Sequence, residues 1–266
     1  MARQFDIRRQ TGFTPIAIAC FVALYAPIIV LVIFSFSAAE NVSVWSGFTL
    51  DWYRKAAQNQ QVIDATLLSV KIAVFAAVFA TAAATLAALA TTRTDGYPGM
   101  TAKYAFINLP LMVPEIVTAV ALLILTARIK IWTGYSGIGY LIAAHTAFCI
   151  PFAYMPIRAR LEGMDLTLER AAADLYAPPW AAFRRVTLPL LWPGILAGFM
   201  LAFVISLDDV VITEFVKSAG QETLPTYMLG QLKRSVTPEI NAISTVFLGI
   251  SILLVTVFFF ISRRKT

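Results

Sequence analysis

Three acidic residues lie inside or at the end of apolar stretches, where an unpaired charge is costly. Glu115 follows Pro114 within a long apolar run, and Asp208 and Asp209 close another. A backbone loosened by proline would let the Glu115 carboxylate face a water-filled cavity. Asp208 and Asp209 are about 100° apart on a helix, so at most one faces a central path squarely, while the other caps a broken helix or holds the next segment. Carboxylates that line a path would attract cations and repel anions.

Each of these residues also has a purely structural interpretation. Glu115 could pair with Lys71 or be protonated in a packed interface, and Asp208 with Asp209 could form a solvated acidic loop. Lys71 is better interpreted as a residue that snorkels to the outer interface. His145, the only histidine, is not part of a Ser, Asp or Cys arrangement typical of a catalytic site, which favours a hydrogen-bonded core histidine over a catalytic one.

No pattern in the sequence indicates catalysis by this chain. We find no P-loop, dinucleotide-binding glycine motif, metal-ligand spacing or nucleophile elbow. Cys20 and Cys149 lie in separate apolar runs without a Cys/His cluster, which predicts neither a disulfide framework nor a metal site. We therefore expect no catalytic residue, metal or cofactor here. If ATP drives the protein, another chain must bind ATP and Mg²⁺.

Composition places the chain in a membrane. Hydrophobic residues make up 59% and charged residues 14%, whereas soluble domains average about 45–50% and about 25%. The formal net charge is +6, but the basic residues sit between apolar segments rather than on one face, which argues against nucleic-acid binding. The first apolar run is too long for a signal-peptide core and is predicted to be retained.

Six apolar segments approach the length of about 20 residues that a membrane-spanning helix needs. They are predicted at 14–37, 62–91, 104–127, 136–157, 190–207 and 242–261. Pro110 and Pro114 should kink or interrupt the third segment, and Pro151 and Pro156 are further breakers in the fourth. The expected fold is all-α and polytopic, with one transmembrane domain over residues 1–266.

The distribution of basic residues predicts the orientation. An even number of spans places both termini on one side. The terminal regions with the 92–103 and 158–189 loops hold 13 Lys and Arg, against 7 in the opposite loops. The positive-inside rule therefore places both termini and the 158–189 loop in the cytoplasm.

The 158–189 loop is the longest polar interruption of the apolar pattern. It predicts a short helix over 165–176, a break at two prolines, and a second helix that ends at Pro189. Trp180 and Phe183, three residues apart, should form a protruding apolar edge that suits a groove on a partner. An ordinary amphipathic cytoplasmic loop is the alternative.

The same loop resembles the "EAA" coupling loop of ABC-importer permeases. Its end, Val186-Thr187-Leu188-Pro189, fits the family pattern Ile-x-Leu-Pro. The double alanine is also in place, whereas the family Glu falls on Arg170 and the family Gly on Tyr176. Tyr176 does not readily adopt the left-handed conformation of glycine, which predicts a differently built turn or a longer first helix. The resemblance implies contacts to an ATPase by Glu169, Arg170, Ala171, Ala172, Tyr176, Leu188 and Pro189.

Over nearly its whole length the chain looks like the C-type permease of spermidine/putrescine ABC importers. The motifs that carry this resemblance are 114–117 (PEIV), 206–211 (SLDDVV), 224–225 (LP) and 237–242 (TPEINA). The resemblance implies the type I importer permease fold in a bacterial inner membrane. It also implies a heterodimer with a second permease, two ATPase subunits and a periplasmic substrate-binding protein.

In this interpretation the chain forms half of a polyamine path that works by alternating access. The acids Glu115, Asp208 and Asp209 would line the path. Related importers carry other small amines, amino-acid-like compounds or organophosphonates, so these cargoes remain alternatives. A membrane sensor or scaffold without transport is an alternative from another class.

Overall fold

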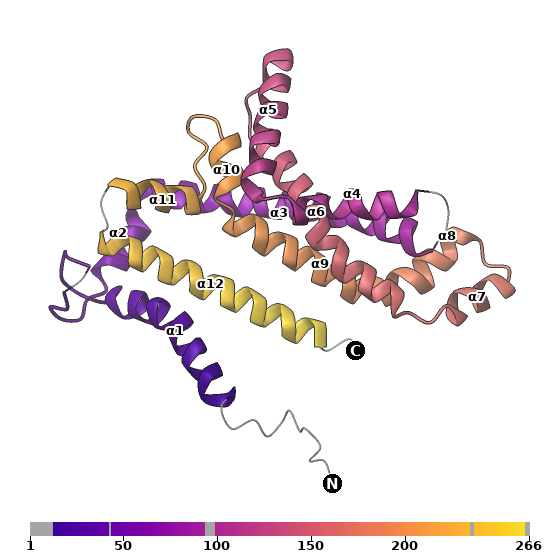
Figure 1. Cartoon of the computed structure of the whole chain (residues 1–266), viewed down its shortest axis with the longest axis horizontal. Coiled ribbons are helices and arrows are strands. Elements are labelled where there is room, and N and C mark those ends of the chain that lie inside the picture. Colours follow the sequence, from indigo (N-terminus) through magenta and orange to yellow (C-terminus); the bar gives the residue numbers. More distant parts are fainter. Residues whose placement is uncertain (1–12, 43, 94–98, 235–236, 264–266) are drawn as a thin grey trace, which may run out of the picture. The chain divides into compact units, whose positions relative to one another are not determined.

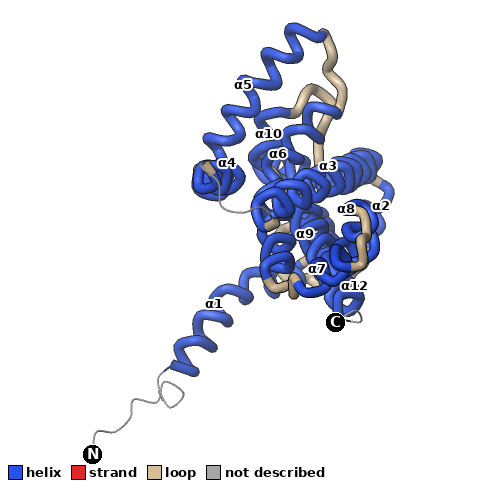
Figure 2. The backbone as a smooth tube through the Cα atoms, turned by 90° about the vertical axis from the view of Figure 1, so that its right-hand side faces the viewer, coloured by secondary structure: helices blue, strands red, loops and turns tan. Residues whose placement is uncertain are grey.

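The computed structural model describes residues 13–42, 44–93, 99–234 and 237–263, and most of them are helical (Figures 1 and 2). The basic residues expected at the cytoplasmic ends, Arg3, Arg8, Arg9, Arg264 and Lys265, lie outside this set. The helices that carry the argument below are α3 (Gln60–Thr92), α4 (Met100–Met112), α5 (Glu115–Thr133), α6 (Gly139–Glu162), α7 (Thr167–Asp174), α8 (Pro179–Ala182), α9 (Leu188–Asp208) and α10 (Val211–Val216). The others are α1 (Phe13–Phe34), α2 (Asp51–Gln58), α11 (Leu224–Arg234), α12 (Pro238–Arg263) and the π-helical turn η2 (Phe183–Thr187).

Six helical stretches in the described part of the chain are long and apolar enough to cross a membrane. They are Thr14–Phe34, Gln60–Thr92, Glu115–Thr133, Gly139–Glu162, Pro179–Asp208 and Pro238–Val257. Many of their large apolar side chains are exposed in the isolated chain, as expected for surfaces that face lipid or a partner. The prediction of an all-helical protein with six spans is confirmed.

The third predicted segment, 104–127, has the wrong bounds because Pro114 divides it. Val113 is extended (φ −89°, ψ 137°), as the proline that follows requires, so α4 ends at Met112 and α5 begins at Glu115. The spanning helix is α5, and α4 is a shorter helix before it. Figure 1 shows the two helices running in different directions. Pro110 lies inside α4, which continues through it.

Pro151 and Pro156 do not break the fourth segment, contrary to prediction. Helix α6 runs through both residues. Pro151 is fully buried, so its packing offsets the backbone hydrogen bond that a proline cannot donate. Neighbouring helices commonly stabilise such prolines in membrane proteins.

Contacts divide the chain into two compact units, Met1–Gln60 with Gly230–Ile250 and Gln61–Leu229 with Ser251–Thr266. In the first, the turn after α1 is held by an isolated bridge between Ser37 and Phe48. The Trp52 indole N–H donates to the Ser37 carbonyl (2.9 Å). Trp45 and Phe48, two of the aromatic residues in this turn, remain exposed.

The second unit is built around the antiparallel pair α6 and α9. A β-carbon at Gly198 would lie 2.7 Å from the Ala153 carbonyl oxygen, and one at Gly194 would lie 2.6 Å from the Arg160 β-carbon. The Arg160 Nε also donates to the Leu190 carbonyl (2.9 Å). Two glycines on one face of α9 therefore let its backbone approach α6 closely, as small residues do between membrane helices.

Candidate functional site

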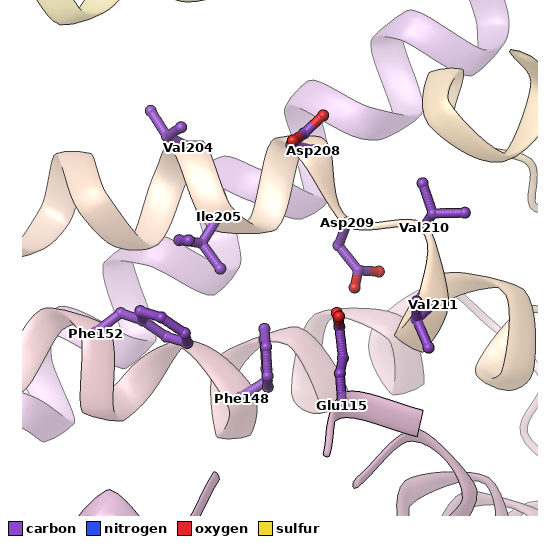
Figure 3. Close-up of a pocket in the computed structure, with 9 residues that line it drawn as sticks. All are labelled: Glu115, Phe148, Phe152, Val204, Ile205, Asp208, Asp209, Val210 and Val211. Carbon is purple, nitrogen blue, oxygen red and sulfur yellow. The ribbon is translucent and has the colours of Figure 1, made fainter. Parts of the chain in front are cut away.

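A cavity of about 430 Å³ lies where α5 begins and α9 ends. Its lining comprises Glu115, Phe148, Phe152, Val204, Ile205, Asp208, Asp209, Val210 and Val211 (Figure 3). The sequence places these residues together because Pro114 starts α5 with Glu115 in its first turn, and α9 stops at Asp208. All three predicted path acids thus line one cavity, although Glu115 is far from Asp208 and Asp209 in the sequence.

Two of the three acids face one another. Glu115 and Asp209 point toward each other across the cavity, whereas the Asp208 side chain points to the other side of the α9 end (Figure 3). Of the two adjacent aspartates, Asp209 is the one whose side chain faces Glu115 across the cavity. Glu115 and Asp208 are exposed and Asp209 is buried.

Asp209 also caps the helix that follows it. Its backbone is extended (φ −65°, ψ 130°), which ends α9. Its Oδ1 accepts the Ile212 N–H (3.2 Å), and its Oδ2 accepts both the Thr213 N–H (2.8 Å) and the Thr213 hydroxyl (2.8 Å). These bonds orient the carboxylate and satisfy the first amides of α10.

His145 completes a buried polar chain behind Asp209. Its Nε2 lies 3.0 Å from Thr213 Oγ1 and 3.5 Å from Asp209 Oδ2, and its Nδ1 lies 2.8 Å from Ser206 Oγ. The Thr213 hydroxyl donates its only proton to Asp209. Nε2–H must therefore donate to Thr213, and in the neutral ring Nδ1 accepts from Ser206. The prediction of a hydrogen-bonded core histidine is confirmed.

The two facing carboxylates have no strongly basic partner. Neither Glu115 nor Asp209 forms an ion pair with a lysine or arginine in the residues that the structure describes. Lys71, the partner considered for Glu115, is exposed on α3. Phe148 and Phe152 lie together on the α6 side, with ring centroids 5.3 Å apart. The cavity therefore offers two facing carboxyl groups and aromatic surface, which together suit an organic cation.

The polar 158–189 segment has the predicted two-helix form but not the predicted end. Helix α7 is followed by an extended Pro178, then by α8 and the wider turn η2. Pro189 does not end the second helix. It lies in the first turn of α9, where a missing N–H is tolerated. The Leu188 N–H bonds to Phe183 five residues back, so η2 joins α8 to α9 without a break.

Tyr176 adopts the left-handed conformation that we did not expect of it. Its φ is +55°. The Tyr176 N–H bonds to the Ala173 carbonyl (2.9 Å) and the Ala177 N–H to the Ala172 carbonyl (3.0 Å). This is the Schellman pattern that usually has glycine at this position. The helix therefore ends as the family motif implies, with tyrosine in place of glycine.

An aspartate precedes the first helix of this segment. The Thr167 N–H donates to Asp165 Oδ1 (2.9 Å), and this bond lowers the pKa of Asp165 below its ordinary value. Because the pKa of this acid is lowered, the hydrogen bond stabilises the folded chain at every pH above the ordinary carboxyl range. This stabilisation is lost only as the pH falls through the lowered pKa. At neutral pH the aspartate is charged and the bond is made.

The exposed face of the segment is aromatic and basic. Tyr176 is 95% exposed and Trp180 70%, and Trp180 stacks on Phe183 with ring centroids 5.6 Å apart. Arg170 is exposed as well. The predicted protruding edge at Trp180 and Phe183 is therefore present.

Glu169 points inward rather than toward this face. Its carboxylate pairs with Arg93 at the end of α3 (3.1 Å between Arg93 Nε and Glu169 Oε2). It also accepts the Thr187 hydroxyl (3.1 Å). Ala171 is exposed and Ala172 partly so, whereas Leu188 is partly buried and Pro189 exposed. The predicted contact residues thus divide into an inward acid and a mostly outward set.

Comparison with known families identifies the class of protein. Residues 101–264 match the family described as the binding-protein-dependent transport system inner membrane component. The chain belongs to this family, and is therefore a non-enzymatic, multi-pass membrane subunit of an ABC importer.

Two relatives from this family are similar to the chain over most of its length. The chain is 35% identical to the putrescine transport system permease protein PotI of Escherichia coli K12, over 86% of this chain and 83% of the relative. It is 38% identical to the spermidine/putrescine transport system permease protein PotC of Haemophilus influenzae, over 91% and 93%.

Solved structures agree on the fold. A bacterial ABC transporter that imports the polysaccharide alginate superposes with a TM-score of 0.71 at 18% identity, covering 95% of this chain and 93% of that one. The MetNI methionine transporter gives a TM-score of 0.63 at 16% identity, over 77% and 95%. The alginate transporter has also been crystallised with its ligand-bound periplasmic protein.

The sequence analysis missed the polar residues that hold Asp209 and His145 in place. Ser206 and Thr213 are hydroxyl residues in apolar stretches on either side of the two aspartates. Their position was the one feature of the sequence that could have predicted hydrogen bonds to His145. Nothing comparable marked Arg93 as the partner of Glu169. Their contact joins positions that only the folded chain brings together.

Proposed function

We propose that this chain is the permease subunit of an ATP-driven importer of polyamines, putrescine or spermidine, and forms half of the translocation path. One observation carries the proposal: Glu115 and Asp209 face each other beside Phe148 and Phe152, and neither pairs with a lysine or arginine in the described part of the chain. The names of the relatives PotI and PotC support the choice of cargo.

The cavity chemistry suits an alkyl ammonium cargo. An ammonium group that leaves water needs acceptors to replace its hydration, and carboxylates supply them at low cost. The methylene chain between amines gains from contact with Phe152 and Ile205, and the aromatic faces attract the charge. A cavity of about 430 Å³ is large enough to hold a short aliphatic amine.

Membership of the family suggests which other subunits the transporter contains. We infer that the chain pairs with a second, related permease and that two ATPase subunits dock on the cytoplasmic segments. A periplasmic binding protein would deliver the cargo. ATP and Mg²⁺ would be bound by the ATPase chains, with no cofactor in this one. The exposed residues Trp180 and Arg170 would meet the ATPase, and Tyr176 would end α7 beside them.

The orientation in the bacterial inner membrane also remains an inference. Both termini and the 158–189 segment would face the cytoplasm, as the distribution of Lys and Arg favours. In the structure, α7 and α8 lie at the opposite end of α6 and α9 from the acidic cavity (Figure 1). A signal from the ATPase would therefore travel along α6 and α9 to the cargo.

Uptake is the direct test. Cells that lack this chain, with and without the restored gene, are assayed for ATP-dependent uptake of labelled putrescine and spermidine, with the partner chains shown to be expressed. Restored uptake of either amine supports the proposal. Equal uptake with and without the gene would rule out a polyamine cargo and leave the family assignment untouched.

A further inference from the structure

Glu169 connects four helical elements through two side chains. Its carboxylate binds Arg93 Nε (3.1 Å to Oε2, 3.3 Å to Oε1) and the Thr187 hydroxyl (3.1 Å). Arg93 Nη1 donates in turn to the Leu161 carbonyl near the end of α6 (3.2 Å). The end of α3, α6, α7 and the η2 turn before α9 therefore meet at one ion pair.

We propose that this Arg93 clamp, made of Arg93, Glu169, Thr187 and Leu161, transmits movement of α7 to the membrane helices. Arg93 is thus a positioning residue for transport that makes no contact with cargo or nucleotide. The proposal rests on the proposed function, because it assumes that an ATPase moves α7.

Burial favours a specific contact over a surface ion pair. The side chains of Arg93 and Glu169 are 19% and 22% exposed, so water and salt screen the pair less than a surface pair. The Thr187 hydroxyl is bonded to the same carboxylate and Thr187 is buried. By contrast, the Arg158–Glu162 pair (2.7 Å) lies within α6, with side chains 34% and 53% exposed. The ion pair joins two residues of one helix, while the Arg158 guanidinium also lies over the Tyr104 ring of α4 (4.2 Å to the ring centroid).

The clamp is connected mechanically to the acidic cavity. Leu161 and Phe148 lie on the same helix, about 20 Å apart at the rise of an α-helix. Thr187 adjoins α9, whose far end carries Asp208 about 30 Å away by the same rise. Because Gly194 and Gly198 hold α9 against α6, displacement of either helix at the clamp displaces the cavity wall. The clamp adds a direct side-chain link from α7 to α6 and η2, beside the backbone connection through α8 and η2.

Arg93→Gln and Glu169→Gln test the clamp in the complete transporter. Uptake per ATP hydrolysed should fall by about tenfold, which is within the range of a coupling free energy between sites. ATP hydrolysis, ATPase copurification and the half-saturating cargo concentration should change by less than about twofold, because the docking face and the cavity are intact. The charge-swapped pair Arg93→Glu with Glu169→Arg should recover part of the lost uptake.

The matched control is Glu162→Gln, which removes the Arg158–Glu162 ion pair within α6, keeps the contact of Arg158 with Tyr104 on α4, and should leave the uptake per ATP unchanged. Unchanged uptake per ATP in Arg93→Gln would overturn the proposal. So would a tenfold loss that the charge swap does not relieve, or a loss that comes entirely from failure to bind the ATPase.

A measurement that needs no cargo tests the clamp independently of the proposed polyamine transport. In the purified full chain, trypsin cleavage after Arg170 should be about fivefold faster in Arg93→Gln than in wild type, because the local opening of α7 becomes easier. Equal cleavage rates would overturn the clamp, even if polyamine uptake is confirmed. Faster cleavage in a chain that carries no polyamine would support the clamp and reject only the cargo.

Discussion

The Glu115 carboxyl points at Asp209 across the place where α5 begins and α9 ends (Figure 3). Each acid stands at a helix boundary that the sequence creates, one after a proline and the other in an extended backbone. A cation between them would contact two helices at once. Any movement that separates these helix ends would therefore change the affinity of the cavity for its cargo.

Glu115→Gln should weaken cargo binding without unfolding the protein. The glutamine is similar in size at an exposed position but lacks the charge. We expect the half-saturating concentration of putrescine or spermidine to rise by roughly 10- to 150-fold, since one charge-assisted hydrogen bond contributes about 1.5–3 kcal/mol. Labelled uptake and copurification of the ATPase measure the two effects. Glu222→Gln, at a well-exposed glutamate away from the cavity, is the control, and equal uptake in the two variants would exclude Glu115 from the path.

Asp209 and Asp208 should differ in what they contribute to stability. Asp209→Ala removes the acceptor for two backbone amides and the Thr213 hydroxyl, which should cost about 1–3 kcal/mol because buried donors lose their partner. Asp208→Ala, at an exposed position, should cost less than about 0.5 kcal/mol. Thermal unfolding of the purified chain in detergent compares them. Similar melting temperatures would contradict the capping role.

Gly198→Ala should loosen the contact between α6 and α9. Its β-carbon would meet the Ala153 carbonyl oxygen at 2.7 Å, and backbone cannot move aside as a flexible side chain can. We expect a loss of about 1–3 kcal/mol from overpacking. Gly249→Ala is the matched control, since nothing lies within 4 Å of its added β-carbon. If the two variants have the same melting temperature, α6 and α9 are not in close contact at Gly198.

The sequence was sufficient for features that depend on composition and on local backbone chemistry. Apolar length predicted the six spans, and Pro114 predicted an interruption before Glu115, because a residue before proline is driven out of the helical region. The acids at membrane depth were found because charge is conspicuous in an apolar run. Their common cavity was expected only through the family resemblance.

Features that depend on tertiary packing were predicted poorly. Pro151 and Pro189 carry the same local signal as Pro114, yet helices run through both, because burial in one case and a first-turn position in the other remove the penalty. Tyr176 was expected to avoid positive φ, but the two Schellman hydrogen bonds at the end of α7 hold it there. No local pattern pairs Arg93 with Glu169, since helix packing alone brings them together.

Tyr176→Gly should therefore keep transport and slightly stabilise the end of α7. A left-handed backbone costs a residue with a β-carbon about 1 kcal/mol, and glycine removes that cost while both backbone hydrogen bonds remain. Thermal unfolding should show the gain, with uptake and ATPase copurification unchanged. Tyr176→Ala separates backbone from side chain, because it keeps the strained φ but removes the ring. If ATPase binding is lost in both variants, the 95% exposed ring is itself a docking contact; if it is lost in neither, Tyr176 serves only to end the helix.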